Sequence, residues 1–151
     1  MHMRTQIETG ADAAEAVAHL DPPGSLTTWC GLQVLIADDS AFQRKLVTAA
    51  LERTGRFDLV VGACDGNEAI GLAELLQPDV VLLDLAMPGL GGLEALPLLL
   101  AVAPRTRVIV MSGSAVAELG ADALAAGARG YVEKGAETEL PAVIDAVLSA
   151  A

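Results

Sequence analysis

Five polar side chains each follow a short apolar run of the sequence, and together they offer chemistry for a cation and a phosphoryl group. They are Asp38, Asp39, Asp84, Ser112 and Lys134. Three carboxylates held close together repel one another unless a cation neutralises them. Small hard cations such as Mg²⁺ bind carboxylate, carbonyl and water oxygens. If the five groups converge, they form an acidic cation site with a hydroxyl and an ammonium beside it.

Each of these residues alone has a plainer interpretation. An aspartate after a strand commonly stabilises the positive end of the next helix, and a serine commonly caps it. A single lysine is usually a solvated surface charge. We favour the site because all five residues follow strands of one predicted sheet.

That sheet is predicted from five short apolar runs separated by longer stretches of helical periodicity. The runs lie at 34–37, 59–61, 80–83, 108–111 and 131–132. Strands that alternate with helices form βαβ units, so we predict an α/β fold with a doubly wound parallel sheet. Ligands of such sheets bind beyond the carboxyl ends of the strands, where the five polar residues lie.

Two helix starts are marked by capping-box spacing, namely Ser40 with Gln43 and Asp65 with Glu68. In the fourth helix, Gly120 interrupts a run of good helix formers. The first helix is predicted to bury an apolar stripe. Its members are Phe42, Leu46, Val47, Ala50 and Leu51.

Composition limits the classes of function. Hydrophobic residues make up 53% of the 151 residues and aromatic residues only 3%, so the core must be aliphatic. Such a composition suits parallel strands buried on both faces. The formal net charge of −11 argues against unaided binding to nucleic acid, because phosphate recognition needs a basic surface.

The cysteines and the apolar stretches favour a cytoplasmic protein. Cys30 and Cys64 form no C-x-x-C pair, so we expect neither a zinc site nor a disulfide. The chain opens without a secretory pattern, and its longest apolar stretch, 96–103, is too short to span a membrane. Residues 1–30 contain the break Pro22-Pro23-Gly24 and are predicted to be a flexible extension of a domain covering 31–151.

Four blocks of the sequence together resemble the receiver domains of bacterial response regulators. They are Val34–Ser40, Pro78–Gly89, Met111–Gly113 and Ala126–Lys134. The resemblance extends from Leu32 to about Ser149. It implies a flavodoxin-like (βα)₅ fold with strand order 2-1-3-4-5.

The resemblance also implies a cation site and a phosphorylation site. Asp84 would accept a phosphoryl group in a reaction that requires Mg²⁺ or Mn²⁺. The implied cation ligands are the carboxylates of Asp38, Asp39 and Asp84 and the backbone carbonyl of Ala86. Lys134 would contact the phosphoryl group, Ser112 would donate a hydrogen bond to it, and Tyr131 would change rotamer as the switch. In one departure from many receivers, Gly135 rather than proline follows Lys134.

The implied function is a phosphorylation-dependent relay. The donor would be a sensor histidine kinase or a phosphotransfer protein. The surface of the fourth helix, fifth strand and fifth helix would then signal to a downstream protein or to a second copy of the chain. The domain would catalyse only its own phosphorylation and dephosphorylation, so it is not expected to be an enzyme in the metabolic sense.

Other functions remain open from the sequence. The chain could act alone, or be the receiver of a longer DNA-binding regulator or hybrid kinase. A metal-dependent phosphohydrolase is a further alternative. The haloacid-dehalogenase type is disfavoured because Asp38-Asp39-Ser40-Ala41 lacks its D-x-D-x-[TV] motif.

Overall fold

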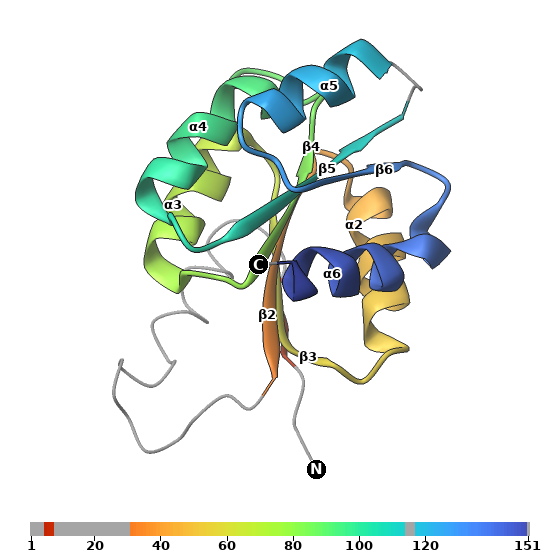
Figure 1. The fold of residues 1–151 in the computed structure, drawn as a ribbon. Coiled ribbons are helices and arrows are strands. Elements are labelled where there is room, and N and C mark those ends of the chain that lie inside the picture. The colour runs from red at the N-terminus through yellow and green to blue at the C-terminus, as the bar shows by residue number, and fades with distance from the viewer. Residues whose placement is uncertain (1–4, 8–30, 114–116, 151) are drawn as a thin grey trace.

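The computed structural model describes residues 5–7, 31–113 and 117–150, with only the backbone described for 5–7 and 117–119. Strands and helices alternate along the chain from residue 32 onward (Figure 1). The strands are β1 (Thr5–Ile7), β2 (Leu32–Ala37), β3 (Phe57–Ala63), β4 (Val80–Asp84), β5 (Arg107–Ser112) and β6 (Gly130–Glu133). The helices are α2 (Ala41–Glu52), α3 (Gly66–Leu76), α4 (Gly92–Val102), α5 (Ala117–Ala125), the 3₁₀ helix η1 (Glu137–Glu139) and α6 (Leu140–Ser149).

All strand pairs are parallel, and the sheet order is β1-β3-β2-β4-β5-β6. The five strands from β2 to β6 therefore have the predicted order 2-1-3-4-5, which confirms the flavodoxin-like topology. The fourth helix, fifth strand and fifth helix of the sequence prediction correspond to α5, β6 and α6.

The strand β1 was not predicted, because it lies within the extension expected to be flexible. Thr5 aligns with Leu59 and Ile7 with Val61, so β1 pairs with the outer side of β3. Without it, β3 would present an unpaired row of N–H and C=O groups at the sheet edge, and such a row readily accepts a further strand. The rest of residues 1–30 lies outside the described part of the chain.

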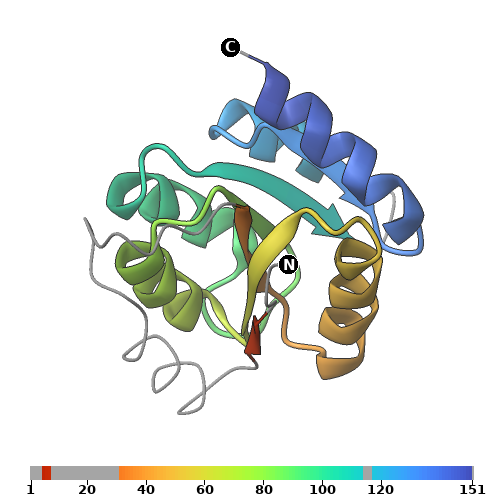
Figure 2. The ribbon, with the colours of Figure 1, turned by 90° about the horizontal axis from the view of Figure 1, so that it is seen from below.

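Two layers of helices cover the sheet, with α3, α4 and α5 on one face and α2 and α6 on the other (Figures 1 and 2). Alternate residues of β2 enter opposite cores: Leu35 packs with the first layer and Ile36 with the second. Both residues are almost fully buried. The aliphatic composition is thus explained by a sheet that is buried on both faces.

The predicted caps are present in the structure. Ser40 Oγ accepts the N–H of Gln43 at 3.2 Å, and Asp65 Oδ1 accepts the N–H of Glu68 at 2.7 Å. The side chain of Gln43 does not return to Ser40, as a reciprocal capping box would require. It donates instead to Glu137, in η1.

The buried stripe of α2 differs from the prediction. Val47 and Leu51 are buried as expected, but Phe42 is 70% exposed and Leu46 is 41% exposed. The inward row is formed by positions 44, 47 and 51, whose spacing follows the helical period, and its first member is Arg44. Phe42 and Leu46 lie about 200° around the helix from Arg44, so they face outward.

Among the described residues, no helix is long and apolar enough to cross a bilayer. The longest, α2, has 12 residues. A membrane-spanning helix needs about 20 apolar residues.

Candidate acidic site at the carboxyl end of the sheet

Three predicted carboxylates meet at the carboxyl ends of β2 and β4. Ala37 aligns with Leu83, so the residues that follow these positions, Asp38 and Asp84, lie side by side. Together with Asp39 they place one carboxylate oxygen each within 4.8 Å of one another. Asp38 and Asp84 are 3% and 2% exposed, whereas Asp39 is exposed. The predicted convergence of the three aspartates is confirmed.

Lys134 reaches this cluster from the loop after β6. Its Nζ lies 3.0 Å from Asp38 Oδ2 and 3.0 Å from Asp84 Oδ2. Its backbone N–H donates to the carbonyl of Ser112 at 2.8 Å, which continues the pairing of β6 with β5 beyond Glu133. A single ammonium therefore bridges the two buried carboxylates, as a solvated surface lysine would not.

The two oxygens of Asp84 have different surroundings. Oδ1 accepts the N–H of Ala86 at 3.0 Å. Oδ2 is buried and accepts no hydrogen bond of normal geometry from the described residues, so its contact with Lys134 is an undirected ion pair. A buried carboxylate oxygen without a directed donor is costly unless a further ligand satisfies it. This atom is therefore suited to bind a cation or to attack an electrophile.

The charges of the site perturb two ionisation equilibria. Burial raises the pKa of the Asp38 carboxyl and the charge of Asp84 adds to the rise, while contacts with the Ser40 N–H and Lys134 only partly oppose it. Burial alone would lower the pKa of Lys134, but its contacts with Asp84 and Asp38 outweigh that effect and raise it. Lys134 thus remains protonated at neutral pH, and bringing the aspartates together has an electrostatic cost.

Ser112 and Tyr131 lie on adjacent strands beside the cluster. Asp84 aligns with Met111, so Ser112 is one residue further toward the carboxyl edge, where it is buried. Tyr131 is half-buried in β6, and its ring packs against α5. A Cβ added at Gly120 would lie 3.3 Å from that ring, so this glycine makes room for the tyrosine. The helix α5 continues through Gly120, and the glycine that interrupts the run of good helix formers has a packing role.

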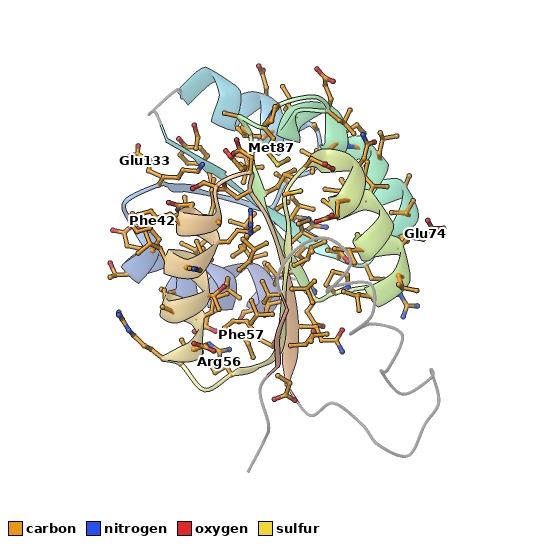
Figure 3. All side chains as sticks on the ribbon, turned by 180° about the vertical axis from the view of Figure 1, so that it is seen from behind. Phe42, Arg56, Phe57, Glu74, Met87 and Glu133 are labelled. Atoms are coloured by element: carbon orange, nitrogen blue, oxygen red, sulfur yellow. The ribbon has the colours of Figure 1, made fainter. Side chains whose placement is uncertain are left out.

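The loop after β4 begins on Asp84 and leads into α4. A Cβ at Gly92 would lie 2.1 Å from the backbone oxygen of Asp84, so only glycine allows α4 to start this close. Ala86, whose carbonyl was predicted as a cation ligand, lies in this loop and is tied to Asp84 by its N–H. In Figure 3, Met87 from this loop and Glu133 from β6 lie at the same end of the sheet, opposite Arg56 and Phe57.

Sequence reasoning missed three residues around the site. Arg44 is 7% exposed, and its Nη1 donates to the backbone oxygen of Asp38 at 2.6 Å. Gly92 seats α4 against Asp84, and Glu137 holds the loop that carries Lys134. Arg44 had a detectable signal, because a charged residue shares its helical face with Val47 and Leu51. Glu137 had no such signal in the sequence. One of its partners, Gln43, is 94 residues away, and the other is a backbone N–H group.

The family and curated comparisons agree with this geometry. A family model described as "Response regulator receiver domain" matches residues 34–145. A protein-glutamate methylesterase/protein-glutamine glutaminase of Myxococcus xanthus is 41% identical over 108 residues, covering 68% of this chain and 30% of that protein. A methylesterase of the same description from Azospirillum brasilense is 38% identical over 109 residues, covering 71% of this chain and 28% of that protein. The chain thus spans about a third of the length of these relatives.

Solved structures match over a larger share of the chain. The response regulator domain of Thermotoga maritima CheB has a TM-score of 0.74 and 32% identity, covering 80% of this chain and 98% of that one. A LuxR-family response regulator from Aurantimonas has a TM-score of 0.74 and 30% identity, covering 79% and 86%. A CheX–CheY–BeF₃–Mg²⁺ complex from Borrelia burgdorferi has a TM-score of 0.73 and 28% identity, covering 79% and 90%. The chain belongs to the response-regulator receiver domain family.

Proposed function

We propose that this receiver domain accepts a phosphoryl group on Asp84 from a sensor histidine kinase or a phosphotransfer protein. The observation that carries the proposal is the buried Oδ2 of Asp84, which accepts no directed hydrogen bond from the described residues and lies 3.0 Å from Lys134 Nζ. A nucleophilic oxygen beside a fixed positive charge is the arrangement that phosphoryl transfer requires.

In the transfer step, Asp84 Oδ2 attacks the phosphorus atom of a phosphohistidine. An O–P bond forms while the P–N bond breaks, and the electron pair returns to the histidine nitrogen, which then takes a proton. Lys134 balances the negative charge of the transferred oxygens, and Ser112 donates its hydroxyl to one of them. Attack by water later breaks the O–P bond and releases inorganic phosphate, which restores the Asp84 carboxylate.

The acidic cluster is suited to hold Mg²⁺ or Mn²⁺. The donors would be Asp38, Asp39 and Asp84 with the backbone carbonyl of Ala86, a set of hard oxygens as these ions prefer. The mutual proximity of the three carboxylates supports this assignment. When bound, the ion supplies positive charge that offsets the charge of the phosphoryl oxygens. The Borrelia relative is recorded with Mg²⁺ and a fluoroberyllate.

The phosphodonor protein would approach over the start of α2. Phe42 and Leu46 lie one helical turn apart and are exposed on the outer side of this helix, which begins three residues after Asp38. Figure 3 shows Phe42 projecting from α2 on the side of the molecule where Glu133 lies. Exposed apolar side chains next to a reactive group are suited to contact a partner protein. We propose a cytoplasmic location, because histidine kinases draw their phosphoryl groups from ATP.

The phosphorylated state would be transmitted through α5, β6 and α6. The Ser112 hydroxyl would turn toward the phosphoryl group, and the Tyr131 ring, which packs against α5 at Gly120, would move with it. The altered face would be recognised by a downstream protein or by a second copy of the chain. A surface with two arrangements, biased by a local charge change, has the properties of a phosphorylation switch.

The comparisons favour a longer signalling protein over a domain that acts alone. The curated relatives are methylesterases in which the matching region is about a third of the length. We therefore propose that the domain controls an effector such as a methylesterase. The second candidate is control of a DNA-binding output, which the sequence also suggested, because a structure described as a DNA-binding response regulator of the LuxR family, from Staphylococcus aureus, matches with a TM-score of 0.72 and 27% identity. In either case the receiver would supply the phosphorylation-dependent control.

The experiment uses acetyl phosphate and Mg²⁺ with detection of the acylphosphate by intact-mass spectrometry. The parent protein should gain one phosphoryl group, and Asp84→Asn should gain none. Asp79→Asn is the matched control, since Asp79 precedes the same strand at its other end. Equal labelling of the parent and Asp84→Asn would refute the assignment, as would loss of labelling in Asp79→Asn while that variant remains folded.

A further inference from the structure

A hydrogen bond between Gln43 and Glu137 joins two segments that are far apart in the sequence. Gln43 Nε2, on α2, donates to Glu137 Oε1, in η1, at 2.8 Å. The same Oε1 accepts the backbone N–H of Gly135 at 3.0 Å. We name this arrangement the Gln43–Glu137 bridge. The proposed phosphoryl chemistry uses none of these three residues.

The bridge starts from the acidic cluster on the α2 side. Asp38 Oδ1 accepts the N–H of Ser40 at 2.9 Å, and Ser40 Oγ accepts the N–H of Gln43 at 3.2 Å. The first turn of α2 is therefore fixed to Asp38 by two hydrogen bonds. The side chain of Gln43 extends this connection from α2 to Glu137.

The bridge returns to the cluster through the loop after β6. Glu137 binds the N–H of Gly135, which directly follows Lys134, and Lys134 Nζ lies 3.0 Å from Asp38 Oδ2. The contacts thus form a closed ring that begins and ends at Asp38. A ring of this kind restricts the position of Lys134 more than a single ion pair does, because each contact limits the freedom of the next.

The peptide of Gly135 needs such a restraint. Its φ is +102°, a region in which glycine is free and other residues are strained. A Cβ at this position would meet no atom within 4 Å, so side-chain packing does not hold the loop there. On its amino side, Lys134 is fixed by its N–H bond to the Ser112 carbonyl. On its carboxyl side, the Ala136 N–H donates to the Glu133 carbonyl at 3.1 Å and closes the turn, and the Gly135 N–H bond to Glu137 adds a second restraint.

Glu137 carries its negative charge at neutral pH, as a strong acceptor of two hydrogen bonds should. Partial burial acts to raise the pKa of its carboxyl, but hydrogen bonds from Gln43 and the Gly135 N–H, with the charge of Lys134, outweigh it and lower the pKa. Hydrogen bonds to an ionised acceptor are roughly twice as strong as neutral ones.

We propose that Glu137, held by Gln43, is a positioning residue that fixes the Gly135 peptide and so keeps Lys134 over Asp38 and Asp84. The proposal rests on the proposed role of Lys134 in phosphoryl transfer. Neither residue of the bridge touches the phosphoryl group. Their effect reaches the reaction only through the position of the lysine.

The test compares Glu137→Ala, Glu137→Gln and the matched control Glu139→Ala. Glu139 is an exposed carboxylate in the same 3₁₀ helix, so its removal changes the net charge equally. Two quantities are measured: amide hydrogen exchange at Gly135, and the rate of Asp84 phosphorylation by acetyl phosphate with Mg²⁺. Acetyl phosphate is small, so docking of a partner protein does not enter the measured rate.

Glu137→Ala should speed exchange at Gly135 and slow phosphorylation, each on the order of tenfold, as expected for the loss of a hydrogen bond to a charged group. Glu137→Gln keeps an acceptor oxygen and should restore much of both. Gln43→Ala leaves the loop sequence intact and should also speed exchange at Gly135 and slow phosphorylation. If Glu137→Ala does not fold, Gln43→Ala alone tests the proposal.

Unchanged exchange at Gly135 in Glu137→Ala and Gln43→Ala would overturn the bridge. Faster exchange with phosphorylation equal to that of Glu139→Ala would overturn its positioning role. Absence of any acylphosphate in the parent would instead refute the proposed function, and exchange at Gly135 would still decide whether the bridge exists.

Discussion

An aspartate lies at each end of β4, and the two side chains have opposite surroundings. Asp79, just before the strand, accepts the N–H of Gln33 through Oδ2 at 2.8 Å, and its backbone bonds to both neighbouring strands. Asp84, the last residue of the strand, has a buried Oδ2 that no donor in the described part of the chain satisfies, and two further carboxylates lie beside it. An aspartate at a strand end therefore does not by itself indicate a functional site. The two positions differ in whether the fold supplies hydrogen-bond donors to the carboxylate.

The same contrast holds for the two ends of the sheet. At the amino end, the buried hydroxyl of Thr106 donates to the carbonyl of Pro78 at 2.6 Å, so polar groups there satisfy one another. At the carboxyl end, like charges converge and the pKa of Asp38 is raised. The contacts at the amino end stabilise the fold. At the carboxyl end, repulsion between carboxylates is unfavourable, and a bound cation can relieve it.

The largest effect we predict concerns the steric fit at the carboxyl end. Gly92→Ala would place a methyl group 2.1 Å from the Asp84 backbone oxygen, so α4 must shift. We expect a loss of about 1–3 kcal/mol in the free energy of unfolding, as for other overpacked sites. Urea unfolding measures it. The control is Gly91→Ala, at the N-cap of α4, where the added Cβ lies 3.8 Å from its nearest neighbour and the loss of a favourable N-cap residue should cost only about 0.5–1 kcal/mol. Equal losses in both variants would show that the close approach is not the cause.

Sequence reasoning captured the features that depend on local pattern. The alternation of strands and helices, the caps at Ser40 and Asp65, and the convergence of the aspartates follow from apolar runs, short-range hydrogen bonding and the geometry of parallel sheets. These need no knowledge of which side chains meet across the core. The strand order was implied by the resemblance to receiver domains.

Features set by contacts between distant segments were not predictable in the same way. Phe42 and Leu46 were placed in the core because they are apolar, yet Arg44 takes the inward position and binds the Asp38 carbonyl. The strand β1 depends on the free edge of β3, and the Gln43–Glu137 bridge joins residues 94 positions apart. In each case tertiary contact outweighed local preference.

A smaller predicted effect is a difference in the free energy of unfolding between variants of the two aspartates at the ends of β4. Asp79→Asn weakens the acceptor for the Gln33 N–H, and we expect it to cost about 1 kcal/mol. Asp84→Asn removes one of several converging negative charges while Lys134 keeps Asp38 as its partner. It should therefore cost nothing, or stabilise the cation-free protein by up to about 1 kcal/mol. Thermal unfolding in EDTA measures both. A larger loss in Asp84→Asn than in Asp79→Asn would contradict the contrast between the two ends.

The smallest effect is a pH dependence of stability that arises from Asp38, at the carboxyl end of the sheet. Because the pKa of Asp38 is raised in the folded state, the folded protein binds this proton more tightly than the unfolded chain does. Its contribution to stability is therefore fully present below the unfolded pKa and is lost as pH rises through the folded pKa. Lys134 also has a raised pKa, but its contribution is lost only in alkaline solution, so the two windows do not overlap.

Asp38→Asn isolates this effect, since asparagine can still accept the Ser40 N–H but does not titrate. In EDTA, the parent should gain stability on acidification relative to Asp38→Asn, and at neutral pH the variant should be the more stable of the two. Mg²⁺ should reverse the order at neutral pH, because it binds the ionised carboxylates that are unfavourable without it. The measurement is a series of thermal unfolding curves across the acidic range, with and without Mg²⁺. Parallel pH profiles for the parent and Asp38→Asn in EDTA would mean that the converging aspartates carry no electrostatic cost, and the contrast between the two ends of the sheet would then rest on hydrogen bonding alone.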